Sequence, residues 1–192
     1  MDVDALWRNF EGASFQHAVW FFPPAFALHV LEEAPRFTRW ARRYASKRFT
    51  HRDFVRNNAL GMASGLILCA AVSFFPHPAL ALAFFALVVW QAGFNTLFHV
   101  ATTAAYGVYS PGLITSLTLY PALCWHLSRL AHRDGVLSDA TGAAAFITGG
   151  VLHAYVVAVQ VYFVRFRFRR PRNSPAHAAS NDSCEPQGTK NG

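Results

Sequence analysis

The chain has 192 residues, of which 53% are hydrophobic and 14% are charged, and its formal net charge is +7 at pH 7. Soluble domains carry about 25% charged residues, so this composition favours a polytopic membrane protein. The basic residues gather between Arg36 and Arg56 and between Arg165 and Arg172, beside apolar segments. That is the pattern of cytoplasmic loops, and it disfavours a nucleic-acid-binding protein.

The first apolar segment covers residues 15–31, after a polar lead over residues 1–14. Pro23 and Pro24 lie in its middle, and because neither has a backbone N–H, we expect a kinked helix there. The segment is long enough to form a first transmembrane span.

Residues 34–56 follow as a basic and aromatic segment. Phe37, Trp40 and Tyr44 recur at helical spacing, with arginines on the remaining faces. This pattern predicts a basic amphipathic helix that lies on the cytoplasmic surface of the membrane. A solvated basic loop is the alternative interpretation.

Four more apolar segments follow, and they predict further spans at residues 58–75, 79–103, 110–127 and 142–164. Ser110 and Pro111 are expected to begin the fourth span, because serine caps helices and proline fits their first turn. A polar loop is expected over residues 128–141. The sequence therefore predicts an all-α bundle of about five transmembrane helices over residues 15–165, followed by a basic and then disordered tail over residues 166–192.

Five spans and the positions of the arginines predict an orientation. The segment 34–56 and the tail are cytoplasmic by the positive-inside rule, so an odd number of spans places the N-terminus outside. The loop 128–141 falls outside and carries Asp134 and Asp139 with few basic residues. The composition, rich in alanine and arginine, suggests a bacterial cell membrane.

His29, Glu32 and Glu33 close the first predicted span. Residues three and four positions apart share one helix face, so both carboxylates lie within about 60° of the histidine. Charge is costly at a membrane boundary, so this cluster needs partners from other helices.

Two other spans bring polar residues to the same depth. Asn95 and His99 are one turn apart on the third span, and His99 lies near its cytoplasmic end. The fourth span begins at this level with Ser110, Pro111, Gly112 and Thr115.

The predicted metal ligands are His29, Glu33, His99 and, somewhat deeper on the fifth span, His153. Imidazole and carboxylate are the ligands of zinc and non-haem iron sites, so we expect a divalent metal, zinc or iron. Asn95 is expected to orient a ligand or to hold a substrate carbonyl. The other predicted binding residues are Pro111, Gly112 and Thr115.

Helix packing alone offers an alternative interpretation of the same residues. Glu32 and Glu33 precede Arg36 by four and three positions, a spacing that suits helical ion pairs. Asn95 and His99 would then hydrogen-bond to neighbouring helices, as polar residues in membrane bundles do.

Three motifs give the chain a resemblance to the HXXEE-domain membrane proteins. They are His29-Val30-Leu31-Glu32-Glu33, Asn95-Thr96-Leu97-Phe98-His99 and Tyr109-Ser110-Pro111-Gly112-Leu113-Ile114-Thr115. The resemblance extends over roughly residues 15–165. It implies a small multi-span membrane protein with these polar residues at its centre, and it supplies no substrate.

A weaker similarity is to intramembrane CAAX-type proteases, which also combine a Glu-Glu pair with separated membrane histidines. Here Arg36 follows the pair one residue sooner than in those proteases, and Asn95 replaces their phenylalanine.

The residues together predict a cytoplasm-facing His/Glu/Asn site, and for an enzyme a metal-dependent hydrolase reaction fits best. Glu33 or a metal would polarise water, and Glu32 would transfer the proton, so both are predicted catalytic residues. A lipid-like substrate follows from the location in the bilayer. The alternative is a non-enzymatic transporter, ion-binding module or structural bundle that uses the same groups.

Overall fold

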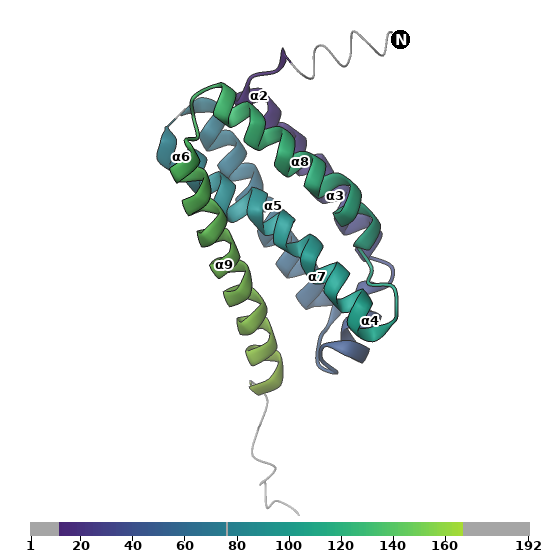
Figure 1. Ribbon diagram of the computed structural model, residues 1–192. Coiled ribbons are helices and arrows are strands. Elements are labelled where there is room, and N and C mark those ends of the chain that lie inside the picture. Colours follow the sequence, from purple (N-terminus) through teal and green to yellow (C-terminus); the bar gives the residue numbers. More distant parts are fainter. Residues whose placement is uncertain (1–11, 76, 167–192) are drawn as a thin grey trace, which may run out of the picture.

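The computed structural model describes residues 12–75 and 77–166, and every element in these ranges is a helix (Figure 1). In chain order the helices are α2 (Phe15–Ala18), the 3-10 helix η1 (Val19–Phe21), α3 (Phe22–Glu33), α4 (Phe37–Tyr44), α5 (His51–Phe74), α6 (Pro78–Phe84), the π-helix η2 (Phe85–Val89), α7 (Trp90–Tyr106), α8 (Leu113–Arg133) and α9 (Asp139–Phe166). The predicted all-α class is confirmed for these ranges. Most of the predicted lead and nearly all of the predicted tail lie outside the described residues.

Two prolines shape the first helical segment. The chain is helical from Phe15 to Glu33, but a 3-10 turn separates α2 from α3, and Pro23 and Pro24 lie in the first turn of α3. Proline is tolerated there because first-turn N–H groups have no partner within the helix. The helix then restarts regularly and presents His29 and Glu33 on its buried face.

The predicted amphipathic helix corresponds to α4, which buries Trp40 and Ala41 and exposes its arginines. A capping box begins α5: the Thr50 hydroxyl accepts from the Asp53 N–H at 3.2 Å, and the Asp53 carboxylate accepts from the Thr50 N–H at 3.0 Å. Helix α5 therefore starts at His51, seven residues before the predicted span. The Thr-x-x-Asp pattern resembles a capping box in the sequence, but the apolar criterion overlooks it.

The predicted loop 128–141 is wrong in extent, because α8 continues to Arg133 and α9 begins at Asp139. Helix α8 ends where Gly135 takes a left-handed conformation (φ +67°) and the Val136 N–H bonds the Ala131 carbonyl. Asp134-Gly135 is thus the helix C-cap and not the middle of a loop.

The longest helices pack as a bundle in which α3 and α8 run side by side and α7 contacts both α8 and α9 (Figure 1). The main core lies toward the α2 and α6 end, where Phe15 stacks on Phe85 with ring centroids 5.7 Å apart and meets Phe84 edge-on. A smaller cluster around Trp40 and Phe54 joins α4 to α5 at the opposite end.

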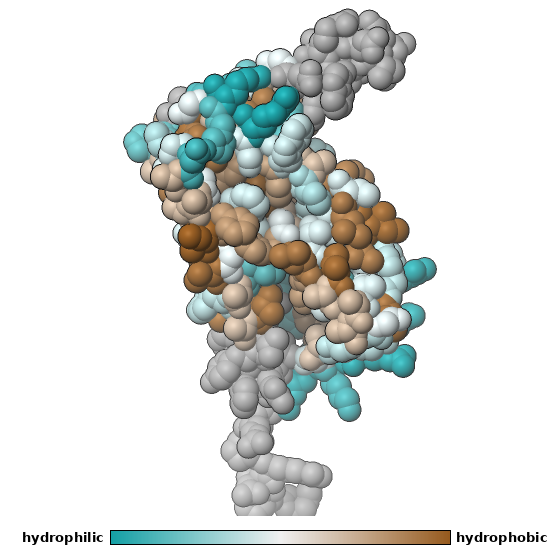
Figure 2. Space-filling view, in the orientation of Figure 1, coloured by the Kyte–Doolittle hydropathy of each residue, from teal (hydrophilic) through white to brown (hydrophobic). Residues whose placement is uncertain are grey.

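Three of the described helical stretches are long and apolar enough to cross a membrane, and they are His51–Phe74, Pro78–Tyr106 and Asp139–Val159. Large apolar side chains on their outer faces are exposed, including Ile67 at 68% and Val151 at 65%. Hydrophobic residues also cover much of the middle of the molecule in Figure 2. These features are consistent with a membrane protein, because exposed apolar surface of this extent is unusual in soluble monomers.

Candidate metal centre

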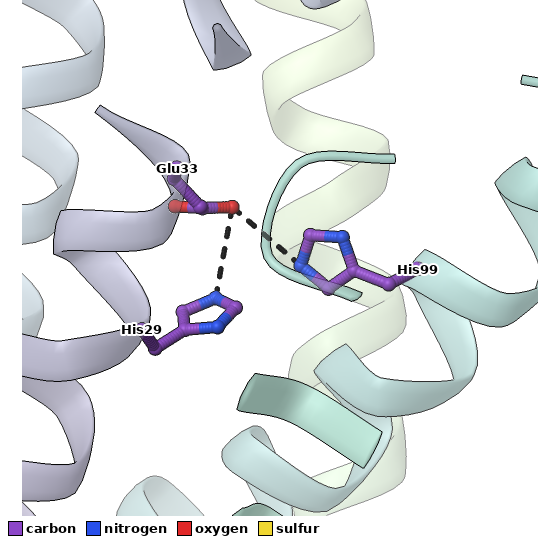
Figure 3. Close-up of side chains that lie close together, drawn as sticks. All are labelled: His29, Glu33 and His99. Carbon is purple, nitrogen blue, oxygen red and sulfur yellow. Dashed lines mark ion pairs between the residues drawn. The ribbon is translucent and has the colours of Figure 1, made fainter. Parts of the chain in front are cut away.

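Three buried side chains from two helices converge on one point. His29 and Glu33 lie one turn apart on α3, and His99 comes from α7 (Figure 3). Glu33 Oε1 lies 3.6 Å from His29 Nε2 and 3.5 Å from His99 Nε2. One ligand atom of each residue lies within 4.8 Å of the other two, a spacing that could hold a metal ion. We call these three residues the His-Glu-His cluster.

The turn before α8 closes one side of this cluster. Gly112 has φ +98°, and a Cβ atom there would lie 2.6 Å from His29 Cε1, 2.8 Å from His99 Cε1 and 3.0 Å from Glu33 Cγ. Only glycine combines this backbone conformation with so close an approach. Pro111 is buried beside it. The two predicted binding residues therefore form a backbone wall against the cluster.

In His29 and in His99, the ring nitrogen Nδ1, which faces away from Glu33, contacts a hydroxyl group. His29 Nδ1 lies 2.9 Å from Thr115 Oγ1, and His99 Nδ1 lies 2.9 Å from Ser110 Oγ. The Thr115 hydroxyl donates its proton to Glu32, so it accepts from His29 Nδ1–H. His29 Nε2 is then the unprotonated nitrogen, and it accepts from Asn95 Nδ2 at 3.1 Å. A hydrogen bond at the other ring nitrogen, here Nδ1, is how metal-binding histidines are oriented.

His99 Nε2 is buried and has no hydrogen-bond partner. An unpaired polar atom in a buried site costs free energy, so such atoms in native structures call for an explanation. Glu33 Oε1 lies 3.5 Å from this nitrogen, and the His29 ring centroid is 5.2 Å from that of His99. A cation bound between the three would satisfy this nitrogen.

Glu32 points to α8 instead of joining the cluster. Its carboxylate accepts from the backbone N–H of Ile114 at 3.1 Å, from that of Thr115 at 2.8 Å, and from the hydroxyls of Thr115 and Tyr109. These contacts cap the N-terminus of α8, where a negative charge is favoured. Burial and the bond to Glu32 raise the pKa of Tyr109 to about 12.

The alternative ion pairs with Arg36 are not formed. Among the described residues, neither Glu32 nor Glu33 has an arginine or lysine nitrogen within 4.0 Å. Glu32 instead accepts hydrogen bonds from the first turn of α8, and Glu33 lies beside the two histidines. The fourth predicted span also begins at a different residue from the one expected. The Ser110 hydroxyl contacts His99 instead of capping the helix, and the N-cap of α8 is Gly112.

Asn95 adjoins the His-Glu-His cluster, whereas His153 does not. Asn95 Nδ2 lies 3.1 Å from His29 Nε2, so this residue adjoins the cluster. His153 lies outside the cluster, and its Nδ1 is 3.1 Å from Gln91 Oε1. The structure thus does not bring the predicted fourth ligand to the other three, because α9 packs against η2 and the first half of α7 at this level.

A cavity of about 360 Å³ adjoins the cluster and is lined by His29, Glu33 and Asn95. Its walls come from α3, α4, the segment between α4 and α5, α5, η2, α7, α8 and α9. Most of the lining side chains are apolar, among them Phe22, Phe26, Phe37, Trp40, Phe54 and Val156. An apolar cavity with a few convergent polar groups is typical of a ligand site.

Gln91 is a cavity residue that the sequence reasoning missed. It lies one turn before Asn95 and two turns before His99 on α7, so a polar stripe at four-residue spacing could have identified it. Its amide holds His153 and donates to the Gly149 carbonyl at 3.2 Å.

A family model described as a protein of unknown function with an HXXEE motif matches residues 20–126. The match covers more than half of the chain and includes the segment from His29 to Glu33. This chain belongs to the HXXEE family. Comparison with curated proteins and with solved structures gave no match.

The geometry divides the HXXEE motif of this protein into two tasks. The histidine and the second glutamate face His99 and the cavity. The first glutamate fixes α8 and, through Thr115, the orientation of the histidine. Glu33, and not Glu32, is among the metal ligands predicted from the sequence, and the position of α8 shows where the Glu32 carboxylate binds instead.

Proposed function

We propose that this HXXEE protein is a membrane-embedded metalloenzyme that hydrolyses a lipid-like amphiphile. In this proposal, His29, Glu33 and His99 hold one zinc or iron ion, and the adjoining cavity receives the substrate. The observation that carries the proposal is the convergence of two imidazole nitrogens, one of them without a partner, on a single buried carboxylate oxygen.

The distances suit a metal site. Two ligands of a tetrahedral zinc ion, each at its usual bond length, lie about 3.4 Å apart. Glu33 Oε1 is 3.6 Å and 3.5 Å from the two histidine nitrogens. Two imidazoles and one carboxylate are a known catalytic ligand set, and three protein ligands leave a position for water or substrate. A bound cation also offsets the cost of burying the Glu33 charge.

The ion would act as a Lewis acid on a water molecule or a substrate carbonyl. Glu33 has two carboxylate oxygens: one faces both imidazoles, and we assign the other as the base that takes a proton from the attacking water. Asn95 Nδ2 donates toward His29 Nε2, and with that nitrogen on a metal the amide is available to a substrate oxygen. The apolar walls of the cavity exclude bulk water from this chemistry.

The proposed setting is a five-span protein in a bacterial cell membrane with its N-terminus outside and its C-terminus in the cytoplasm. Beside the three long apolar helices, the segment Phe15–Glu33 and α8 contact one another along the bundle (Figure 1). At 1.5 Å per residue each is about 30 Å long, close to the thickness of the hydrocarbon layer. The exposed arginines of α4 support a cytoplasmic position for the neighbouring His-Glu-His cluster.

The test is the metal content of the protein purified in detergent, measured by elemental analysis. Wild type is expected to hold about one zinc or iron per chain, and His29→Ala, Glu33→Gln and His99→Ala are expected to lose it. His153→Ala is the matched control: it removes an imidazole from the same cavity but not from the cluster, so its metal content should equal that of wild type.

The second step separates an enzyme from a metal-binding module. Wild-type protein is incubated with fluorogenic lipid esters and amides, before and after chelation and again after zinc is restored. Zinc-dependent hydrolysis that disappears in Glu33→Gln supports the proposal. Metal-free wild type that does not take up zinc in a titration would end the metalloenzyme proposal, and a metal-loaded protein inert to every lipid would favour an ion-binding role.

A further inference from the structure

A second hollow lies on the surface between α4 and the turn before α8. It measures about 350 Å³ and is lined by Arg36, Arg39, Trp40, Arg43, Tyr44, Val108, Tyr109 and Pro111. We call it the arginine groove. The Trp40 side chain lines both this groove and the cavity beside the metal centre, so it separates the two. The groove is therefore a distinct site.

Three guanidinium groups face the groove without an acidic partner. Arg36, Arg39 and Arg43 are spaced by three and four residues, which brings them to one side of α4. In the part of the chain that the structure describes, no carboxylate lies within 4.0 Å of these three side chains. By contrast, Arg42 donates to the Phe49 carbonyl at 2.7 Å.

The nearest acid cannot neutralise the groove. Glu32 already accepts four hydrogen bonds, three from the first turn of α8 and one from Tyr109, which itself lines the groove. The negative charge of Glu32 is therefore balanced by the N-terminus of α8 and not by the arginines. The groove keeps a surplus of three positive charges that lie next to the aromatic rings of Trp40, Tyr44 and Tyr109.

An apolar strip begins beside the groove and runs along the outer faces of α3 and α8. The Ile114 N–H is bonded to Glu32, so the exposed side chains of the two helices adjoin there. The strip comprises Leu28, Leu31, Ile114 and Leu117, which are all exposed. In Figure 2, hydrophilic side chains likewise project at the α4 end of the molecule and apolar surface lies next to them.

From the charge of the groove and the apolar strip beside it, we propose that the arginine groove binds the phosphate of an anionic phospholipid, with the acyl chains lying along the strip. Guanidinium groups form paired hydrogen bonds with phosphate oxygens, and three of them can surround one phosphate. A soluble phosphate compound would use the arginines but not the strip, so the strip favours a lipid. The proposal does not depend on the metal centre.

The test compares two triple variants with equal loss of charge. Arg36→Gln/Arg39→Gln/Arg43→Gln changes the groove. Lys47→Gln/Arg48→Gln/Arg52→Gln removes three exposed charges from the neighbouring segment and leaves the groove intact. Delipidated protein in neutral detergent is titrated with phosphatidylglycerol and with phosphatidylcholine of the same chain length, and bound lipid is counted by native mass spectrometry.

Wild type is expected to bind phosphatidylglycerol at least tenfold more tightly than phosphatidylcholine. The groove variant should lose at least tenfold in affinity, and the control variant should stay within twofold of wild type. Melting temperature and zinc content, measured on all three proteins, should be equal, because the changed side chains are exposed.

Three results would overturn the proposal. Equal losses in the two triple variants would mean that general surface charge attracts the lipid. Equal binding of the two phospholipids would mean that the groove does not recognise the anionic headgroup. Displacement of the lipid by glycerol 3-phosphate at the same concentration would mean that the ligand is a soluble phosphate and that the apolar strip plays no part.

Discussion

Replacement of Gly112 by alanine is the sharpest test of the His-Glu-His cluster. The new Cβ would lie 2.6 Å and 2.8 Å from the Cε1 atoms of His29 and His99, so both rings would have to move. The φ of +98° adds strain of about 1–2 kcal/mol for any residue with a Cβ. Forcing an extra methyl into a packed site costs about 1–3 kcal/mol more. Together these predict a loss of about 3 kcal/mol in stability.

The effect on metal binding should be larger than the effect on folding. Disturbing the groups that orient metal ligands lowers affinity by about 10–100-fold, and here two ligands are displaced at once. We therefore expect Gly112→Ala to bind zinc at least 100-fold more weakly than wild type. Competition with a fluorescent chelator measures this affinity, and thermal unfolding in detergent measures stability.

Gly107→Ala is the matched control, because Gly107 also has positive φ (+61°) but no atom lies within 4 Å of the position that a Cβ would take there. It should lose only about 1 kcal/mol and keep its zinc affinity. If the two alanine variants were equally stable and bound zinc equally, the close approach of the turn to the cluster, and the metal site built on it, would be refuted.

Two further predictions concern the carboxylates. Glu32→Gln should still bind the metal, but about tenfold more weakly, and should lose about 1 kcal/mol of stability. Glu33→Gln should not bind metal. Zinc titration measures the affinity of each variant, and thermal unfolding measures its stability. Asp134 pairs with Arg133 and accepts from the Phe15 N–H at 2.7 Å, and the pairing with Arg133 lowers its pKa. Its stabilisation is thus complete above the ordinary carboxyl pKa and is lost as pH falls through the lowered pKa, so Asp134→Asn should cost about 1 kcal/mol at pH 7 and progressively less in acid.

The ends of the helices show one limit of the sequence reasoning. Apolar composition located the segments, but α5 starts at a capping box and α8 continues to Arg133, where the left-handed Gly135 follows its C-cap, and both ends lie beyond the apolar residues. A helix ends where its terminal hydrogen bonds are satisfied, and that point need not coincide with the end of an apolar run. The signals were present in Thr50, Asp53 and Gly135, but they are local polar signals that a hydropathy pattern does not contain.

Local periodicity by itself determined that this chain is helical, that His29 and Glu33 lie one turn apart on one helix face, and that Asn95 and His99 do so on another helix. Such pairs follow from the geometry of a single helix, whatever surrounds it. Tertiary structure alone decided that Glu32 caps α8, and that His153 contacts Gln91 instead of the cluster. Those outcomes depend on where neighbouring helices lie and how they are rotated, and many side-chain contacts spread along the whole bundle set these positions.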